Sequence, residues 1–197
     1  MRTLILNADF IPLSTISWRR AFSLWFVNQE MPGEGLEPIE FYQDKTVRSA
    51  GGKDFPIPCI SRVPYYVNRS KRKVPFSRKN VYIRDELTCQ YCGKLFDKDD
   101  LTLDHVVPRV EWARSKMKGS PTCWENIVTC CFPCNSKKAD KSLKSCGLRL
   151  IKGLPTQPKG DVYIPGISPW STDIPDQWVP YLKIIYKNFK IGTPAGV

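Results

Sequence analysis

Hydrophobic positions in the first third of the chain predict a small region of strands and one helix. The apolar run at residues 3–6 (TLIL) is typical of a short strand. Residues 14–26 (STISWRRAFSLWF) predict a helix with Ser17 as its N-cap. Its aromatic residues recur at helical spacing: Trp18, Phe22, Trp25 and Phe26. We interpret that stripe as core rather than as a binding site. Residues 31–61 mix Gly and Pro with short apolar runs such as IEFY, which predicts strands and turns.

The pattern after residue 76 predicts further elements, which fall around several cysteines. They are a helix over 78–86 capped by Ser77, a strand over 101–108 (LTLDHVVP), a short helix at the capping-box sequence Thr122-Cys-Trp-Glu125, and a basic helix over 135–146 that Gly147 ends. The tail after residue 153 is rich in proline, and its pattern predicts no function. Because strands and helices are predicted both before and after residue 76, the sequence indicates an α+β protein.

Charge is concentrated in two parts of the chain, which carries 30 basic and 19 acidic residues and a formal net charge of +11. Residues 62–84 hold eight basic residues and no acidic one, and residues 135–160 hold seven basic residues and one acidic one. A basic run by itself is also compatible with a solvated linker. Because these two blocks bracket a nearly neutral, cysteine-bearing segment, we favour binding to the phosphates of a nucleic acid, ahead of an anionic membrane surface.

Several classes of protein are excluded or disfavoured by composition. Apolar residues at 42% and aromatic residues at 12% argue against wholesale disorder. No run approaches the roughly 18 apolar residues of a membrane span. The first ten residues, MRTLILNADF, reach Asn and Asp too soon for a signal peptide. A single histidine, His105, excludes a metal site built from several histidines.

Four of the eight cysteines form two Cys-x-x-Cys pairs, Cys89 with Cys92 and Cys131 with Cys134. Two such pairs supply the four thiolates of a tetrahedral structural Zn²⁺ site, with one ion per chain. Their wide separation indicates that a segment is looped out between them. Disulfides and a redox Cys-x-x-Cys are the alternatives. Both are disfavoured, because the chain lacks a secretion signal and a redox motif normally stands alone.

The looped-out segment contains His105 directly after Asp104, at the end of the predicted strand. A lone histidine is more often structural than catalytic, and alternation along a strand sends neighbouring side chains to opposite faces. Here, however, the pair lies between two cysteine pairs and two basic blocks. Asp104 and Asn135 offer oxygen ligands for a hard cation such as Mg²⁺, and histidine suits a general base near neutral pH.

With these motifs in order, the sequence resembles the HNH endonucleases of the ββα-metal type, in their four-cysteine zinc form. The resemblance covers residues 77–147 and rests on SRKNVYIRDELTCQYCGK, LTLDHVVPR, TCWENIV and CCFPCNSKKADKS. Upstream, LILNADFIPLSTISWRRAFSLWF is similar to a leader segment of phage and bacterial members, and IPDQWVPYL in the tail is similar but less specific. The implied fold is a small ββα-metal module stapled by zinc, with an N-terminal α+β extension and an irregular C-terminal tail.

The resemblance also implies roles for individual residues. Asp104 and Asn135 would hold a catalytic Mg²⁺ or Mn²⁺, His105 would be the general base, and Asn126 would fix the loop and the histidine. We expect nucleic-acid contacts from nine basic side chains: Arg69, Lys71, Arg72, Lys73, Arg78, Lys79, Arg109, Lys137 and Lys138. One stretch departs from the family pattern: residues 110–121 (VEWARSKMKGSP) are longer than expected, and either a DNA contact or a solvated loop fits them.

The sequence therefore predicts four parts: an accessory region at 1–61, a basic linker at 62–76, the HNH nuclease module at 77–150 and a Pro-rich extension at 151–197. The predicted function is metal-dependent hydrolysis of phosphodiester bonds in DNA, by nicking or double-strand cleavage, in a phage or homing-type endonuclease. We expect double-stranded DNA as partner, no membrane association, a monomer or homodimer, and a cytoplasmic location in a bacterial or phage-infected cell. The alternatives are a non-catalytic zinc-stabilised DNA-binding module and an RNA-directed nuclease.

Overall fold

The chain folds into two compact units in a computed structural model that describes residues 1–115, 117–189 and 191. Unit 1 comprises residues 1–72 and the described residues from 161 onward, and unit 2 comprises residues 73–160. Both contain strands and helices, so the fold class is α+β, as the sequence predicted. Among the described residues, no helix has the length and apolar character needed to span a membrane.

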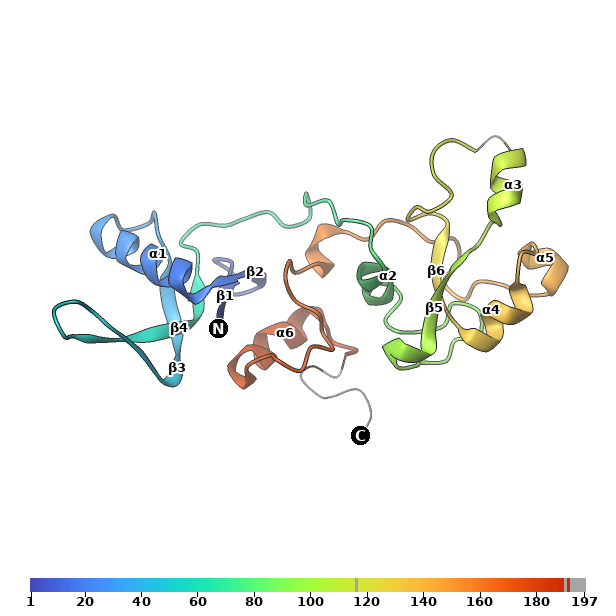
Figure 1. Ribbon diagram of the computed structural model, residues 1–197. Helices are drawn as coiled ribbons and strands as arrows, with labels where there is room; N and C mark the ends of the chain where they lie inside the picture. The colour runs from blue at the N-terminus through green and yellow to red at the C-terminus, as the bar shows by residue number, and fades with distance from the viewer. Residues whose placement is uncertain (116, 190, 192–197) are drawn as a thin grey trace. The chain divides into compact units, whose positions relative to one another are not determined.

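Unit 1 is built on a four-stranded sheet with the strand order β2-β1-β4-β3. The strands are β1 (Arg2–Leu6), β2 (Pro12–Ser17), β3 (Glu37–Arg48) and β4 (Asp54–Arg62). β1 pairs antiparallel with β2 and parallel with β4, and β3 and β4 form a long antiparallel hairpin. Figure 1 shows this hairpin extending past the end of α1 (Trp18–Glu30).

Helix α1 begins where the sequence predicted, because the Ser17 side chain accepts a hydrogen bond from the Arg20 amide. Its aromatic stripe is less buried than expected. Ala21 is the buried residue of the helix, and it packs with Ile5, Leu13 and Leu36. The aromatic side chains of the helix pack against the hairpin instead. The ring centroids of Phe22 and Phe26 lie 6.0 and 5.4 Å from that of Phe55. These rings line an open groove of about 470 Å³ and remain partly exposed, so the stripe forms the edge of the core rather than its centre.

The C-terminal segment belongs to unit 1 from residue 161 onward and carries the helices η3 (Asp176–Trp178) and α6 (Val179–Ile185), and the 3₁₀ turn η2 (Gly160–Val162) spans the boundary between the units. Trp178 is buried and donates its indole N–H to the Cys59 carbonyl over 3.0 Å, and Tyr181 donates to Glu40. The contacts thus divide the chain after residues 72 and 160, whereas the sequence suggested divisions at 61, 76 and 150. The difference arises because the C-terminal segment packs on the sheet of unit 1. Local sequence patterns do not predict this long-range packing.

Unit 2 contains a ββα arrangement made by β5 (Leu101–His105), β6 (Ile127–Cys131) and α4 (Phe132–Lys138). β5 and β6 pair antiparallel, with Asp104 opposite Val128 and His105 opposite Ile127. Every residue of β6 is buried, and α4 follows it directly and lies along the pair (Figure 1). The turn from Cys131 into α4 therefore joins the strands to the helix without a loop.

Helix α2 (Arg78–Arg84) closes the other side of β6, and Ser77 caps it as predicted. Tyr82 donates its hydroxyl hydrogen to the Leu101 carbonyl over 2.7 Å. Asp85, just past the helix, accepts from the Thr129 amide, and Arg84 pairs with Asp85 and donates to the Ile127 carbonyl. These bonds satisfy the free edge of β6 and fix α2 against the strand.

Three local predictions in unit 2 need correction. The strand at 101–108 ends at His105, three residues before Pro108. Thr122-Cys-Trp-Glu125 forms a turn, because the chain must enter β6 at Ile127. The basic helix over 135–146 is two helices, α4 and α5 (Leu143–Cys146), interrupted at Ala139, where φ is 48°. Gly147 does end α5, in the left-handed conformation that glycine favours. A 3₁₀ turn, η1 (Lys98–Asp100), and a helix, α3 (Arg109–Arg114), complete the unit.

Candidate active site and metal centre

The structure gathers the four paired cysteines at one end of the ββα unit. The Sγ atoms of Cys89, Cys92, Cys131 and Cys134 all lie within 4.8 Å of one another. Sulfurs bound to one tetrahedral Zn²⁺ stand about 3.8 Å apart, given a Zn–S bond of about 2.3 Å. The cluster is therefore compatible with a zinc site after only a small contraction.

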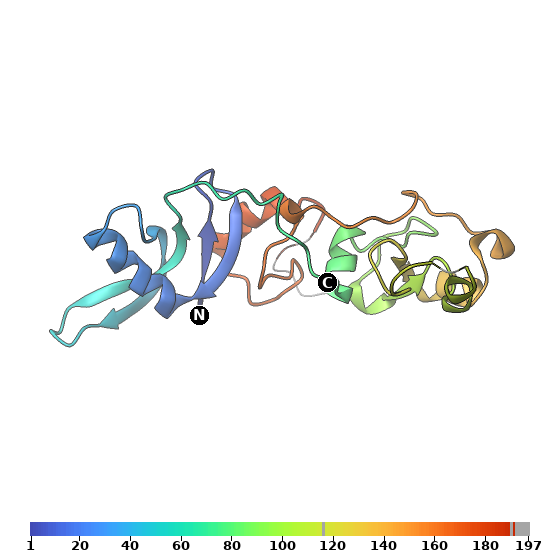
Figure 2. The same ribbon diagram turned by 90° about the horizontal axis from the view of Figure 1, so that it is seen from above.

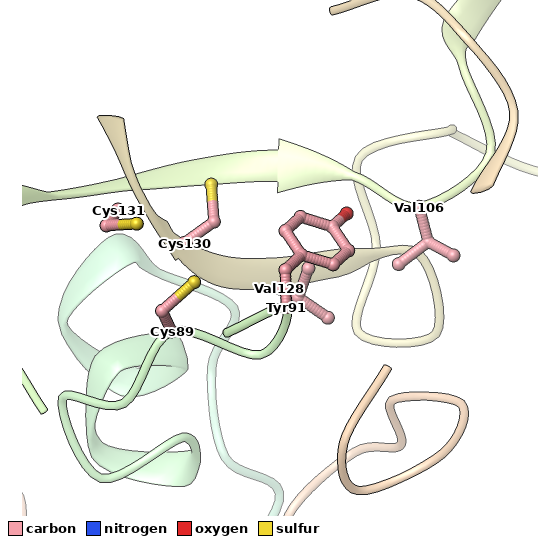
Figure 3. Close-up of a cluster of buried hydrophobic side chains, with 6 residues drawn as sticks. All are labelled: Cys89, Tyr91, Val106, Val128, Cys130 and Cys131. Carbon is pink, nitrogen blue, oxygen red and sulfur yellow. The ribbon is translucent and has the colours of Figure 1, made fainter. Parts of the chain in front are cut away.

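Two different turns present these thiols. The first is a loop in which the Gly93 amide donates to the Cys89 carbonyl, with Gly93 at a φ of 74°. In the second, Cys131 ends β6 and stands at the N-cap of α4, which places Cys134 in the first turn of the helix. Cys130 lies outside the thiol group, in a buried cluster with Tyr91 and Val128 (Figure 3).

Proton affinities within the cluster are uneven. Burial raises the pKa of Cys89, but hydrogen bonds from the backbone of Cys92, Cys131 and Tyr91 outweigh it, and the pKa falls to about 7. Burial and the neighbouring thiols raise the pKa of Cys134. One thiolate thus forms easily and makes the next one harder to form, which is the electrostatic situation that a bound divalent cation relieves.

A separate pocket of about 240 Å³ opens where β5 ends. It is lined by Asp104 and His105 from β5, by Pro108, Arg109 and Val110 at the start of α3, and by Lys138, Ala139 and Asp140 at the end of α4. Asp104 and His105 are adjacent in the strand, yet both reach this pocket because it lies at the strand's end. The structure therefore brings the two candidate catalytic residues together.

Asp104 is held by two neighbours that bind the same carboxylate oxygen. The Tyr91 hydroxyl donates to Oδ2 over 2.5 Å, and the Lys138 ammonium lies 3.0 Å from Oδ2. Lys138 also donates to the His105 carbonyl over 2.6 Å and is only 1% exposed. Burial and hydrogen bonding to Asp104 raise the pKa of Tyr91, which keeps its hydroxyl a donor. Within the described residues, Oδ1 has no hydrogen-bond partner.

His105 is half-buried and has two neighbours at its Nε2 atom. Thr122 Oγ1 is hydrogen-bonded to it at 3.0 Å, and Arg109 Nε donates to it over 3.4 Å. Since arginine can only donate, these contacts assign Nε2 as the unprotonated nitrogen. Burial and the charge of Arg109 lower the pKa of His105, against the opposing effect of Asp104. The imidazole is therefore neutral, and able to accept a proton, at neutral pH.

Asn126 holds the loop that follows β5. It is 1% exposed; its Oδ1 accepts from the Val107 amide over 2.8 Å, and its Nδ2 donates to the carbonyls of Val107 and Pro121. Asn126 does not line the pocket. It fixes the backbone directly after His105 and directly before Thr122, which is hydrogen-bonded to the histidine ring.

Replacing Asn126 by alanine is expected to destabilise unit 2 by about 2–4 kcal/mol, because three partly buried backbone groups lose their partner. Asn135→Ala provides the matched control. Asn135 is partly exposed and has no recorded side-chain hydrogen bond among the described residues, so its loss should change stability by less than about 0.5 kcal/mol. Urea unfolding of both variants measures the difference. Equal destabilisation would contradict this division of roles.

Asn135 itself is placed less directly than the other candidates. It lies in α4, three residues before Lys138, and is not among the residues that line the pocket. Side chains three apart share a helix face, and Lys138 on that face reaches Asp104. Asn135 thus lies on the side of α4 that approaches Asp104, without a recorded contact to it.

The nine basic residues predicted to contact nucleic acid differ in how exposed their side chains are. Arg69 and Lys138 are 6% and 1% exposed, and their charged groups bind the Asp161 carbonyl and the Asp104 carboxylate, so neither is free to contact a phosphate. Arg72 donates to the Leu13 carbonyl, and Lys79 is partly buried. The remaining five are exposed: Lys71, Lys73, Arg78, Arg109 and Lys137.

The long segment at 110–121 begins as a helix, because α3 runs through Arg109–Arg114. Arg114 and Lys118 are exposed, and Lys116 lies outside the described residues. The pocket-lining Arg109 and Val110 come from the first turn of α3. The segment therefore contributes its first residue, Val110, to the lining of the pocket, a role that the sequence pattern did not indicate.

Two residues of the site were missed by sequence reasoning, Tyr91 and Thr122. Tyr91 occupies a position that the Cys89-x-x-Cys92 motif leaves unspecified, and Thr122 was predicted to cap a helix. Neither carries a spacing signal, because each meets its partner only when β5 and β6 pair.

Two family models match the chain, one in each unit. The family model for HNH endonuclease matches residues 89–141, and the model for the HNH endonuclease-associated N-terminal domain matches residues 3–71. No curated protein and no solved structure shows a significant match. The first match contains both cysteine pairs and the residues of the pocket.

Proposed function

Because the chain carries an HNH endonuclease domain at residues 89–141, preceded by its associated N-terminal domain, we propose that the protein hydrolyses phosphodiester bonds in DNA with the help of a divalent cation. The observation that carries this proposal is the pocket in which Asp104 and His105 lie side by side. The domain implies nuclease activity on nucleic acid. DNA as substrate, the metal and the residue roles are our proposals.

His105 serves as the general base in this proposal. The neutral imidazole takes a proton from a water molecule, and the resulting hydroxide attacks phosphorus as the bond to the leaving oxygen breaks. Support comes from the lowered pKa of the ring and from its place at the pocket wall. Asn126 and Thr122 hold the ring and its loop, and the exposed guanidinium of Arg109 lies where it can contact a phosphate oxygen.

Asp104 and Asn135 are the residues we propose for Mg²⁺ or Mn²⁺. A buried carboxylate with one oxygen left unbound at a pocket wall fits a hard cation, and an amide oxygen is a suitable second ligand. Such an ion, when bound, supplies positive charge against the negative charge that develops on the phosphate. The four thiols suit Zn²⁺ instead, in a structural role.

The exposed basic residues support a polyanionic partner, which we propose is double-stranded DNA bound by a monomer or homodimer. The same proposal places the protein in the cytoplasm of a bacterial or phage-infected cell, as a phage or homing-type endonuclease that nicks or fully cuts its target.

Incubation of the zinc-loaded protein with supercoiled plasmid tests this function. We expect relaxed or linear product with Mg²⁺ or Mn²⁺ and no product without either. Duplex binding without cleavage under any divalent cation would indicate the non-catalytic DNA-binding alternative. Preferential cleavage of RNA in a parallel reaction would indicate the RNA-directed one.

A further inference from the structure

Tyr91 and Lys138 connect the cysteine cluster to the catalytic carboxylate. Tyr91 stands between Cys89 and Cys92 in the first cysteine turn. Lys138 ends the helix that begins at the second cysteine turn. Each residue therefore extends from one cysteine pair, and both converge on Oδ2 of Asp104.

We infer that Tyr91 and Lys138 are positioning residues that fix the Asp104 carboxylate so that Oδ1 alone faces the pocket for a divalent cation. This inference rests on the proposed function. A free carboxylate rotates and presents either oxygen, whereas a hydrogen bond from Tyr91 and an ion pair with Lys138 on the same Oδ2 select one orientation. Outer-shell partners of a ligating carboxylate typically influence metal affinity or activity by about 10–100-fold.

Burial makes the arrangement rigid. Tyr91 is 7% exposed and packs with Val106 and Val128, as Figure 3 shows, with its hydroxyl at the end of the ring away from the cysteines. Lys138 is almost fully enclosed, and its second bond, to the His105 carbonyl, ties the backbone of the general base to the same ammonium. The buried Lys138 side chain thus fixes the Asp104 carboxylate and the His105 backbone relative to each other.

The contacts of Lys138 distinguish this role from phosphate binding. An ammonium that contacts DNA must reach solvent, whereas this one is enclosed by a hydrogen bond to the His105 carbonyl and an ion pair with the Asp104 carboxylate. Removing it should lower the cleavage rate and leave the salt dependence of DNA binding unchanged. Lys137, the exposed neighbour of Lys138, serves as the comparison for phosphate contact. Removing a lysine that contacts a phosphate should instead lower the slope of log binding constant against log salt concentration by about one.

Tyr91→Phe tests the inference most cleanly, because it deletes one hydroxyl and keeps the buried ring. Mn²⁺ binding to the zinc-loaded protein is measured by electron paramagnetic resonance, alongside plasmid cleavage and DNA affinity. We expect Mn²⁺ affinity to fall about tenfold or more, kcat to fall with it, and DNA affinity to stay unchanged. Tyr181→Phe is the matched control, because its hydroxyl also donates to a carboxylate, that of Glu40 in unit 1, and should change none of the three.

Lys138→Met provides the second variant and should lower kcat by about 10–100-fold at an unchanged salt slope. Unchanged or tighter Mn²⁺ binding by Tyr91→Phe, with unchanged kcat, would overturn the inference alone and leave the proposed function standing. A wild-type protein that cuts no DNA would overturn the proposed function, whereas the Mn²⁺ comparison would still report on the positioning of Asp104. If the wild type bound no Mn²⁺, both would be overturned.

Discussion

Replacing His105 by alanine is expected to lower the rate of DNA cleavage by at least about 100-fold, the lower end of what a general base contributes, without weakening DNA binding. The ring is half-buried at the pocket wall and carries no structural bond beyond Thr122 and Arg109 among the described residues. Stability should therefore change little. Single-turnover cleavage of a plasmid, with binding measured on the same substrate, separates the two effects.

His105 is the only histidine of the chain, which permits a second measurement on the unmodified sequence. Diethyl pyrocarbonate modifies neutral imidazole, so one modified histidine per chain should abolish cleavage.

Arg109→Ala provides the contrast, because it removes an exposed charge beside the ring and should weaken DNA binding more than the chemical step. Cleavage by His105→Ala at the wild-type rate would remove His105 from the mechanism.

Local signals in the sequence predicted the elements that carry this site. Ser17 and Ser77 cap α1 and α2 as expected, since capping depends on one side chain and an amide three residues later. The cysteine pairs were equally readable, because each spans one tight turn. The predictions failed where a second element decides the outcome: Thr122 resembles a helix cap, but its hydroxyl binds His105 once the strands pair.

Burial of charge was the least predictable property. Lys138 and Arg69 stand in basic runs, where solvent exposure is the normal expectation. Both are nearly enclosed, because Asp104 lies across from the end of α4 and the chain near Asp161 returns to unit 1. No pattern within either run distinguishes these two residues from their exposed neighbours. Only the path of the chain does so.

Replacing Cys131 by serine is expected to remove zinc and to unfold the ββα unit. Metal analysis of the wild type should find close to one Zn per chain, and the variant should hold almost none. Structural Zn²⁺ contributes about 10–16 kcal/mol of apparent binding free energy in small zinc modules, which is comparable to the roughly 5–15 kcal/mol that stabilises a typical domain. A unit that depends on this ion therefore does not survive the loss of a ligand.

The position of Cys131 makes its replacement more disruptive than the loss of a thiol at a loop would be. It ends β6 and begins α4, so the metal would fix the corner on which Asp104, Lys138 and the strand pair depend. Hydrogen exchange should lose protection in residues 85–150 and keep it in the sheet of unit 1, which has its own buried core. Cys123→Ser is the matched control, because Cys123 lies in the same unit outside the thiol cluster. If Cys131→Ser retained zinc and protection like this control, the four-cysteine site would not be what holds the nuclease unit together.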